Sequence, residues 1–399
     1  MNIVWLTPEI PYPPYGGRNG VYNRIVQLSK YHDIYLFSIA YYEEESKTTN
    51  EMERYCREVR YYDRSESKVK TLLKSMILPY SVASRTRKNI VRDIEALNSR
   101  IDIDAVIVDF PNMALNIKKI AKCDVFVTMN QHNVEYKRMR DMVNIRTISL
   151  FKRMAYYIES LRLEIYEAWL YHSKLTDSIT FFSEDDMKFF KKRWKNCKSD
   201  LKVFPLGANR LDCVPAPGKH NILFVGRLDE VAVTNVEAVV WFCDNVLPSI
   251  KEKINDVKFI IAGANPSQRI LDRVSENIVV IPNYKDLQEV YSQADCVVLP
   301  LLSGGGVKGK LLEAAALKRI IITTSKGIEG TKFENGKHVF LADDCAGFAK
   351  ACVRALTEPV SCAEVVTAAY ALFEKYYDWE AIGKTYNCYL KEMVCKTNF

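Results

Sequence analysis

Short runs of apolar and β-branched residues alternate along the whole chain with longer stretches in which apolar residues recur at helical spacing. The runs of the first half are Ile3–Leu6, Ile34–Ile39, Ala105–Val108, Val125–Met129 and Ser178–Phe181. Those of the second half are Asn221–Val225, Val257–Ala262, Ile278–Ile281, Cys296–Leu301 and Ile320–Thr324. This alternation of strands and helices in both halves predicts two α/β units, each built on a parallel sheet.

An irregular, proline-containing segment, Ala208–Gly218, lies between the two halves and is the predicted linker. At 399 residues the chain is too long for one hydrophobic core, so we expect two domains, 1–212 and 213–375. Two such sheets joined by a short linker face each other across a cleft, and ligands of open α/β sheets bind beyond the carboxyl ends of the strands. Both domains are therefore expected to contribute loops to one site.

The composition, 48% apolar and 26% charged, is that of an ordinary soluble protein. Eleven cysteines without a Cys-x-x-Cys pair indicate reduced thiols in the cytosol and not a disulfide framework. The segment Met1–Leu6 predicts a strand and not a secretory signal, and no window approaches the about 18 consecutive apolar residues of a spanning helix. We therefore expect a cytoplasmic protein.

The net charge of +7 is unevenly distributed. Residues 137–200 hold 14 Lys or Arg and 9 Asp or Glu, an excess of +5, with large apolar side chains between them. One basic helix in this region carries an apolar stripe, which consists of Phe151, Met154, Tyr157, Leu161 and Ile165. We expect the stripe to pack inward, and contact with an anionic membrane surface is the alternative. No nucleic-acid reader motif accompanies the charge, so we expect no nucleic-acid partner.

The most informative motif is Ser303–Glu313, a glycine-rich loop between a predicted strand and a predicted Ala-rich helix. Backbone N–H groups at a helix N-terminus attract anions, and Lys308 and Lys310 add two positive charges. This pattern predicts a diphosphate site, and a flexible turn is the alternative. Glu313 lies one turn into the helix, where bound phosphates would repel its carboxylate unless the carboxylate contacts another group. Ribose hydroxyls are the natural partner for it. No Gly-Lys-Ser or Gly-Lys-Thr closes the loop, so it is not a Walker loop. Its spacing also differs from that of a dinucleotide-binding fingerprint.

Three shorter motifs follow predicted strands, and each has a purely structural alternative. Gly16 and Gly17 precede the predicted helix Val21–Leu28, where they would let a phosphate approach the backbone or simply form a turn. Arg227 follows the first strand of the second half and would grip a phosphate through its forked donors. His132 follows the fourth strand of the first half, where it would hydrogen-bond a hydroxyl or shuttle a proton.

Two acidic pairs are predicted not to be sites. Asp102 and Asp104 resemble the pair with which some sugar transferases hold a divalent metal, but they precede their strand and so lie at the wrong end of the sheet. Asp185 and Asp186 follow Ser183, as at an ordinary helix start. Because no His, Cys or Asp cluster has metal-ligand spacing, we expect no bound metal.

Together these motifs resemble glycosyltransferase family 4, retaining transferases of the two-domain GT-B fold. The segments that carry the resemblance span nearly the whole chain in this order: Gly16-Gly17, His132-Asn133-x-Glu135, Phe224-Val225-Gly226-Arg227, Val307–Ala314, Thr323-Thr324-Ser325 and Gly327-x-Glu329-Gly330. The resemblance implies two Rossmann-like α/β domains. It also implies that a sugar passes from a nucleotide-diphosphate donor to an acceptor hydroxyl with retained configuration, without a metal or other cofactor.

Carried over position by position, the resemblance gives each motif a role. Arg227 and Lys308 would hold the diphosphate with Lys310 as a helper, Glu313 would bind the ribose, and His132 would contact the transferring sugar. The other expected donor-binding positions are Gly16, Gly17, Gly305, Gly306 and Val307. Fixed cations and a helix N-terminus would then stabilise the negative charge of the departing nucleoside diphosphate in place of a metal.

The resemblance also assigns roles to the domains. Residues 213–375 would bind the nucleotide-sugar donor, residues 1–212 would bind the acceptor, and a C-terminal helix, 376–399, would pack back onto the first domain. Our main hypothesis is a cytoplasmic hexosyltransferase that assembles a bacterial surface polysaccharide on a glycan or lipid-linked acceptor, at the inner face of the membrane.

Two positions depart from the family pattern. Gly305 replaces the first of two glutamates separated by seven residues, and Ala232 replaces a lysine five residues after Arg227. These departures leave two alternatives open. One is a nucleotide-sugar epimerase of the same fold, for which His132 is the only obvious acid or base. The other is a non-catalytic partner that keeps the fold as an interaction surface.

Overall fold

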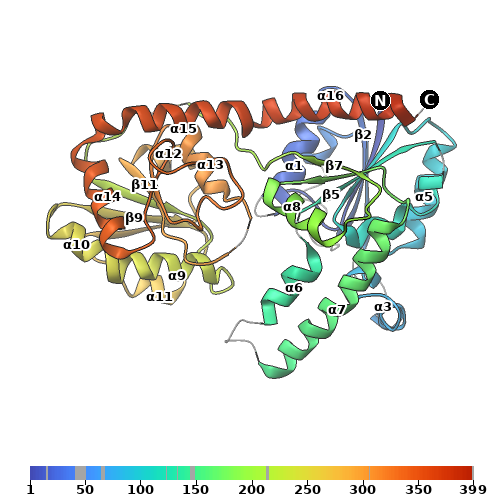
Figure 1. Cartoon of the computed structure of the whole chain (residues 1–399), viewed down its shortest axis with the longest axis horizontal. Coiled ribbons are helices and arrows are strands. Elements are labelled where there is room, and N and C mark those ends of the chain that lie inside the picture. Colours follow the sequence, from blue (N-terminus) through green and yellow to red (C-terminus); the bar gives the residue numbers. More distant parts are fainter. Residues whose placement is uncertain are drawn as a thin grey trace. The chain divides into compact units, whose positions relative to one another are not determined.

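The chain divides into two α/β units, each built on its own parallel sheet (Figure 1). Unit 1 comprises Met1–Pro205 and Gly383–Phe399, and unit 2 comprises Leu206–Ile382. The computed structural model describes residues 1–14, 17–40, 51–63, 68–122, 124–132, 134–143, 149–212, 215–304 and 306–397.

Unit 1 is built on a seven-stranded parallel sheet in the order β3-β2-β1-β4-β5-β6-β7. Its strands are β1 (Asn2–Thr7), β2 (Asp33–Ala40), β3 (Glu58–Asp63), β4 (Ala105–Asp109), β5 (Phe126–Gln131), β6 (Ser178–Phe181) and β7 (Asp200–Val203). Its helices include α1 (Gly17–Leu28), α3 (Lys68–Ser75), α4 (Tyr80–Ala83), α5 (Lys88–Asn98), η1 (Pro111–Ile117), η2 (Ile120–Lys122), α6 (Glu135–Val143), α7 (Leu150–His172) and α8 (Glu184–Arg193). The strand order reverses between β1 and β4, and in open α/β sheets such a switch point is where ligands bind.

Unit 2 has a six-stranded parallel sheet in the order β10-β9-β8-β11-β12-β13. Its strands are β8 (Asn221–Val225), β9 (Lys258–Gly263), β10 (Ile278–Pro282), β11 (Cys296–Leu299), β12 (Ile320–Thr323) and β13 (Phe340–Leu341). Its helices include α9 (Val233–Trp241), η3 (Phe242–Val246), α10 (Leu247–Lys251), α11 (Gln268–Leu271), α12 (Leu287–Ser292), α13 (Gly309–Ala316), α14 (Cys345–Thr357), η4 (Pro359–Cys362) and α15 (Ala363–Tyr376). The switch point of this sheet lies between β8 and β11.

Both faces of each sheet are covered, which explains why the central strands are apolar along almost their whole length. In β1, Val4 and Leu6 pack into one hydrophobic cluster, and Ile3 and Trp5 pack into another on the opposite face. The residues of β8 divide between two clusters of unit 2 in the same way. A strand buried on both faces has no polar side, so its sequence is a continuous apolar run.

The predicted fold, two parallel Rossmann-like sheets, is confirmed, and all ten predicted strands form. The sequence analysis missed β3, β7 and β13, which are all edge strands. An edge strand has a neighbour on one side only and buries less of its surface, so charged residues such as Asp200 and Lys202 of β7 interrupt the apolar run that would have marked it.

The apolar stripe of α7 does not pack inward, so that expectation is wrong. Phe151 is 83% exposed and Ile165 is 73% exposed. The opposite side of the helix, with Leu163, Tyr166 and Leu170, fills the core instead, which makes α7 apolar on two faces. Within the described part of the chain, no helix is both long and apolar enough to cross a membrane.

The last helix, α16 (Trp379–Thr397), packs against unit 1 from Gly383 onward. A Cβ at Gly383 would lie 2.5 Å from the Cβ of Gln27 on α1, so a larger side chain would push the helices apart. The Tyr386 hydroxyl donates to Oδ1 of Asn130 over 3.1 Å, and the Tyr389 hydroxyl lies 2.5 Å from that of Ser178. These contacts attach α16 to the carboxyl half of β5 and to the start of β6.

Candidate functional site

The glycine-rich loop joins β11 to α13 at the switch point of unit 2. Gly304 and Gly306 have φ angles of 93° and 78°, in the left-handed region that favours glycine. The loop folds so that the ammonium of Lys308 donates to the carbonyls of Gly304 (3.2 Å) and Gly306 (2.6 Å). Burial lowers the pKa of Lys308. Lys308 therefore holds the shape of the loop where α13 begins.

The ammonium of Lys310 lies at the carboxyl end of β8. It donates to Oδ1 of Asn235 over 2.8 Å and sits 4.0 Å from the ring centroid of Phe224, a cation–π contact. Burial lowers the pKa of Lys310 to about 7, although the Glu313 carboxylate opposes this shift. A Cβ at Gly226 would lie 2.9 Å from the ammonium, so the absence of a side chain there makes room for it.

Asn235 on α9 connects the two loops at this edge of the sheet. Its amide nitrogen donates to the carbonyl of Arg227 (2.9 Å), while its amide oxygen accepts from Lys310. The guanidinium of Arg227 pairs with Asp229 (2.6 Å), and its side chain remains 58% exposed. Residues that follow β8 and residues of α13 are thus held together through one amide.

Glu313 lies one turn after Lys310 on α13 and is half-buried. The buried hydroxyl of Tyr291 donates to its Oε2 over 3.2 Å. Burial raises the pKa of Glu313, and the Tyr291 hydrogen bond and the Lys310 charge partly offset that rise. The Glu313 carboxylate is therefore held through one of its two oxygens, Oε2, by the hydrogen bond from Tyr291.

In unit 1, His132 follows β5 and is buried. Its Nε2 lies 2.8 Å from Oδ1 of Asp109, at the end of β4. The imidazole stacks on Phe110, with ring centroids 4.0 Å apart, and meets Phe182 edge-on at 4.7 Å. Because a carboxylate only accepts hydrogen bonds, Nε2 carries the proton, and Nδ1 is the nitrogen that Asp109 does not hold.

Asp109 is completely buried and accepts two further hydrogen bonds, from Nε1 of Trp5 and from the side-chain amide of Asn130 (3.0 Å). Asn130 in turn accepts from Thr180 (2.6 Å) and from Tyr386 of α16. A polar network therefore runs from β1 through β4, β5 and β6 to the last helix, and it fixes the orientation of His132.

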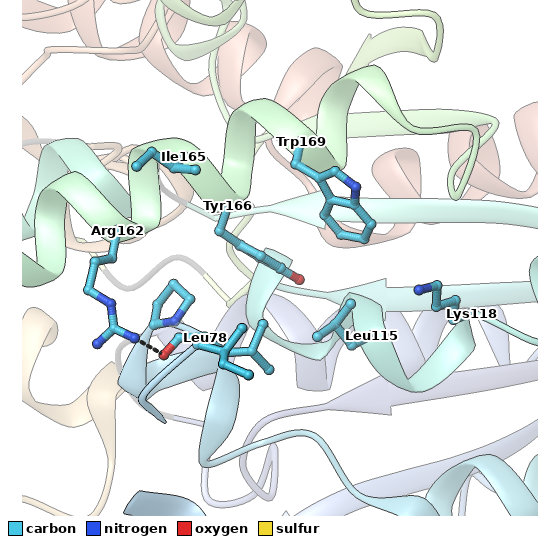
Figure 2. Close-up of a pocket in the computed structure, with 9 residues that line it drawn as sticks. Leu78, Leu115, Lys118, Arg162, Ile165, Tyr166 and Trp169 are labelled. Carbon is cyan, nitrogen blue, oxygen red and sulfur yellow. Dashed lines mark hydrogen bonds between the residues drawn. The ribbon is translucent and has the colours of Figure 1, made fainter. Parts of the chain in front are cut away.

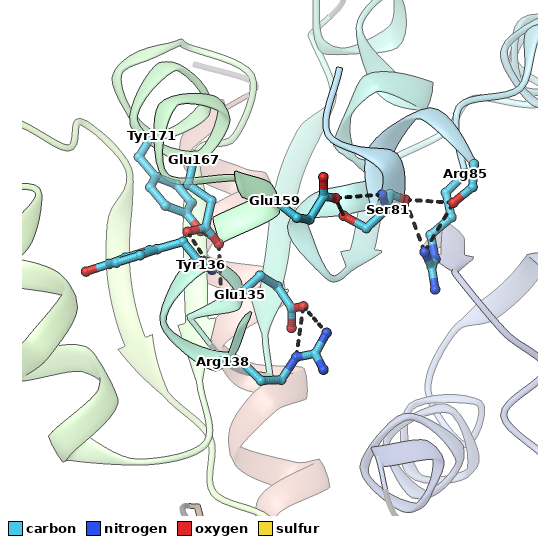
Figure 3. Close-up of polar contacts among 9 residues, drawn as sticks. Ser81, Arg85, Glu135, Tyr136, Arg138, Glu159, Glu167 and Tyr171 are labelled. Carbon is cyan, nitrogen blue, oxygen red and sulfur yellow. Dashed lines mark hydrogen bonds and ion pairs between the residues drawn. The ribbon is translucent and has the colours of Figure 1, made fainter. Parts of the chain in front are cut away.

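The helix that follows His132 is anchored by Glu167 of α7 (Figure 3). Its carboxylate accepts from the backbone N–H groups of Glu135 (3.1 Å) and Tyr136 (3.4 Å), the first residues of α6, and from the Tyr171 hydroxyl (3.4 Å). Negative charge at a helix N-terminus is stabilising. Complete burial nevertheless raises the pKa of Glu167 to about 8.

We expect Glu167→Gln to flatten the dependence of stability on pH. The folded-state pKa of about 8 lies above the ordinary value of 4.5, so the folded chain binds more protons than the unfolded chain between these values. The contribution of this carboxyl to stability is thus complete below pH 4.5 and is lost as the pH rises through about 8. The melting temperature of the variant should fall several degrees less over that range than that of the wild type.

Circular dichroism melts across this pH range measure the difference. Glu164→Gln is the matched control, because Arg193 and Arg140 lower the pKa of Glu164, and its contribution is therefore lost only as the pH falls. Parallel curves for the wild type and Glu167→Gln would contradict the prediction.

The structure accounts for the remaining predicted positions as follows. Gly17 is the first residue of α1, and Val307 packs against the core of unit 2. Gly16 and Gly305 lie outside the described residues, as does Asn133. Nothing in the geometry tests the donor roles assigned to these positions, and they stay predictions.

The acidic pairs have the structural roles expected of them. Asp104 accepts from the backbone N–H of Asn2 (2.6 Å) in the loop before β4. Ser183 caps α8 by accepting from the backbone N–H of Asp186 (3.1 Å). Among the described residues, no group of three or more His, Cys, Asp or Glu side chains is placed to hold a metal ion.

Asn235 and Asp109 were not predicted as site residues. Asn235 follows Thr234 in the first turn of α9 and has no distinctive signal in the sequence, whereas Asp109 ends a buried apolar strand. A polar residue at the carboxyl end of such a strand was the signal that also pointed to Arg227, and it could have found Asp109.

A model of the glycosyl transferases group 1 family matches residues 219–358, the segment that holds Arg227, Asn235, Lys310 and Glu313. The match covers residues 219–358, within unit 2. The resemblance to glycosyltransferase family 4 is thereby confirmed. The chain is also similar to an uncharacterized 44.6 kDa protein in the cps region of Klebsiella pneumoniae, with 27% identity over 393 residues, which cover 94% of this chain and 96% of that protein.

Solved structures confirm that the chain has the GT-B fold. Sucrose-phosphate synthase from Thermosynechococcus elongatus matches with a TM-score of 0.68 and 13% identity over 99% of both chains. Anabaena HepE in complex with UDP and glucose matches with a TM-score of 0.65 and 11% identity, over 98% of this chain and 100% of that chain. At such low identity these likenesses concern the fold alone.

Proposed function

We propose that this protein moves a sugar from a nucleotide-diphosphate donor to an acceptor hydroxyl, with retained anomeric configuration and without a metal. The observation that carries the proposal is the ammonium of Lys310, held against Phe224 and Asn235 at the switch point of unit 2. Its pKa of about 7 indicates a cation that lacks a sufficient counter-charge. A diphosphate would supply that charge.

The proposed diphosphate ligands are Lys310, Arg227 and the N-terminus of α13. The backbone N–H groups at a helix N-terminus are suited to phosphate oxygens, and the exposed guanidinium of Arg227 can exchange Asp229 for the ligand. A departing nucleoside diphosphate accumulates negative charge. Each fixed donor aimed at that charge contributes about 10²- to 10³-fold in rate.

The position of Lys310 also bears on the missing family lysine. Ala232 is the residue immediately before α9, and Asn235, in the first turn of that helix, binds the Lys310 ammonium. In this proposal a cation therefore reaches the start of α9 from α13, in place of a lysine at position 232. This arrangement argues against a non-catalytic role.

Glu313 is the proposed ribose ligand, because Tyr291 bonds to one carboxylate oxygen and the other can accept from sugar hydroxyls. His132 is proposed to contact the transferring sugar through Nδ1, since Asp109 occupies Nε2. Asp109 acts as a positioning residue in this scheme.

The relative encoded in the cps region supports a role in surface polysaccharide assembly, on a glycan or lipid-linked acceptor. The HepE complexes with UDP and UDP-glucose make a UDP-hexose the first donor to test. We further propose that the reaction takes place at the cytoplasmic face of the membrane.

A thermal-shift screen against UDP, GDP, dTDP and their sugar conjugates tests the proposal. The true donor should stand out, because stabilisation grows with the ratio of ligand concentration to dissociation constant. Isomerisation of a nucleotide sugar in the absence of acceptor would instead favour an epimerase. Absence of nucleotide binding in calorimetry would favour a non-catalytic partner.

Donor binding should take up a proton above neutral pH. With a pKa of about 7, Lys310 is mostly neutral at about pH 8, and a bound diphosphate would raise its pKa and recharge it. Donor affinity should therefore weaken, by up to about tenfold per pH unit, as the pH rises above 7. Calorimetry in two buffers of different ionisation enthalpy measures the proton count. Lys310→Met should abolish the uptake, and equal heats in both buffers for the wild type would contradict the prediction.

A further inference from the structure

Unit 1 carries an extended apolar surface on residues 69–80 and 150–169, here named the α3–α7 face. Of the twenty-two large apolar side chains that are exposed among the described residues, fourteen lie on it. On α7 they recur every three or four residues, and the turn after α3 adds Met76 (78% exposed) and Ile77 (86%). Soluble monomers rarely expose so many large apolar side chains on adjoining elements, and such patches mark interaction sites.

The two segments of the face are joined by hydrogen bonds. The guanidinium of Arg162 on α7 donates to the carbonyls of Ser75 and Leu78, the latter over 2.6 Å (Figure 2). The backbone N–H of Ser81 donates to Glu159 of α7 over 3.1 Å (Figure 3). The exposed side chains of the turn and of α7 therefore belong to one surface.

A pocket of about 440 Å³ lies within this face. Its lining is mainly apolar, with contributions from Ile77, Leu115, Ile165 and Trp169. Lys118 and Arg162 lie at its opposite ends (Figure 2). An apolar lining between two cations suits an amphiphile with a hydrocarbon chain and an anionic head group.

The charge around the face is strongly positive. Residues 68–92 contain seven Lys or Arg and no Asp or Glu. The acidic groups of α7 are compensated or buried: Glu164 lies between two arginines, Glu159 lies 4.0 Å from Arg162, and Glu167 is inaccessible. The face therefore combines large apolar side chains with an excess of basic over acidic residues in the segment 68–92.

We propose that the α3–α7 face docks this protein on an anionic phospholipid bilayer. The apolar side chains enter the boundary of the acyl chains, the cations contact the head groups, and the pocket receives a lipid chain. A second copy of the chain would instead bring two basic 68–92 segments together, so the charge opposes self-association and favours an anionic surface. The inference rests on this face alone and is independent of the proposed donor site.

Flotation of the full-length protein with vesicles tests the proposal. Vesicles that contain phosphatidylglycerol should bind the wild type, and phosphatidylcholine vesicles should bind it weakly. The double variant Phe151→Asp/Ile165→Asp should lose about tenfold or more in affinity, because it places two charges in the apolar boundary. Both side chains are exposed, so the variant should fold. Val360→Asp, at a position that is 87% exposed in unit 2, is the matched control and should bind like the wild type.

Equal vesicle binding by the double variant and the wild type would overturn the proposal, and so would no binding by the wild type. A wild-type dimer that the double variant converts to a monomer, without vesicle binding by either, would identify the face as a contact between copies. Nucleotide binding, measured on the same samples, reports on the donor site separately.

Discussion

Replacing Lys310 with alanine is expected to lower the rate of sugar transfer by about 10²- to 10³-fold. The ammonium of Lys310 is fixed by Asn235 and Phe224 before any ligand arrives, so it needs no reorganisation when charge develops on the leaving diphosphate. Alanine at this position removes that cation and its contact with the Phe224 ring. Steady-state kinetics with the donor found in the thermal-shift screen measure the loss, and circular dichroism establishes that the fold is kept.

Two other lysines of unit 2 make this test selective. Lys337 is exposed and pairs only with Glu334 among the described residues, so Lys337→Ala should transfer sugar at the wild-type rate. The transfer rate of Lys308→Ala should lie between those of Lys310→Ala and Lys337→Ala, with a loss of about tenfold relative to the wild type. The reason is that the Lys308 ammonium bonds to loop carbonyls and so affects the site through the shape of the loop. A Lys310→Ala variant as active as the Lys337 control would remove the basis of the proposed function.

The apolar pattern predicted the fold because both sheets are buried on both faces. A buried strand such as β8 is apolar at every position, and that signal is local. The edge strands β3, β7 and β13 lack a continuous apolar run and were missed, whereas β10, also an edge strand, keeps such a run and was predicted. For α7, the sequence indicated the apolar stripe that proves to be exposed. It did not indicate the second apolar face of the helix, which carries Leu163 and Leu170 and packs into the core.

The glycine-rich loop was predictable for a similar reason, since glycines, lysines and a strand–helix junction are neighbours in sequence. The different hydrogen-bond partners of its two lysines, Lys308 and Lys310, could not be predicted from the sequence. Lys308 folds back because of the backbone conformation at Gly304 and Gly306, and Lys310 finds Asn235, 75 residues away, only in the folded chain. The family resemblance made Lys308 the main expected ligand with Lys310 as its helper, and the proposed function exchanges these roles because the two ammonium groups have different partners.

Replacing His132 with alanine is expected to lower the transfer rate by about 100-fold while leaving nucleotide binding unchanged. His132 belongs to unit 1, and the residues proposed to bind the nucleoside diphosphate belong to unit 2. The loss should therefore appear in kcat and not in the thermal shift produced by the nucleotide. His172→Ala, an exposed histidine of the same unit, is the control. A weakened nucleotide response in His132→Ala would contradict the role assigned to it.

Asp109→Asn tests whether the carboxylate acts through His132. An asparagine amide can donate to Nε2, which would shift the imidazole proton to Nδ1 and reverse the donor and acceptor roles of the ring. The single variant should then lose about as much activity as His132→Ala, and the double variant should lose no more, because both remove the same oriented imidazole. Strictly additive losses would mean that Asp109 serves the fold alone, through Trp5 and Asn130. An altered pH profile of kcat in Asp109→Asn, with an unchanged melting temperature, would distinguish positioning of the histidine from a structural role.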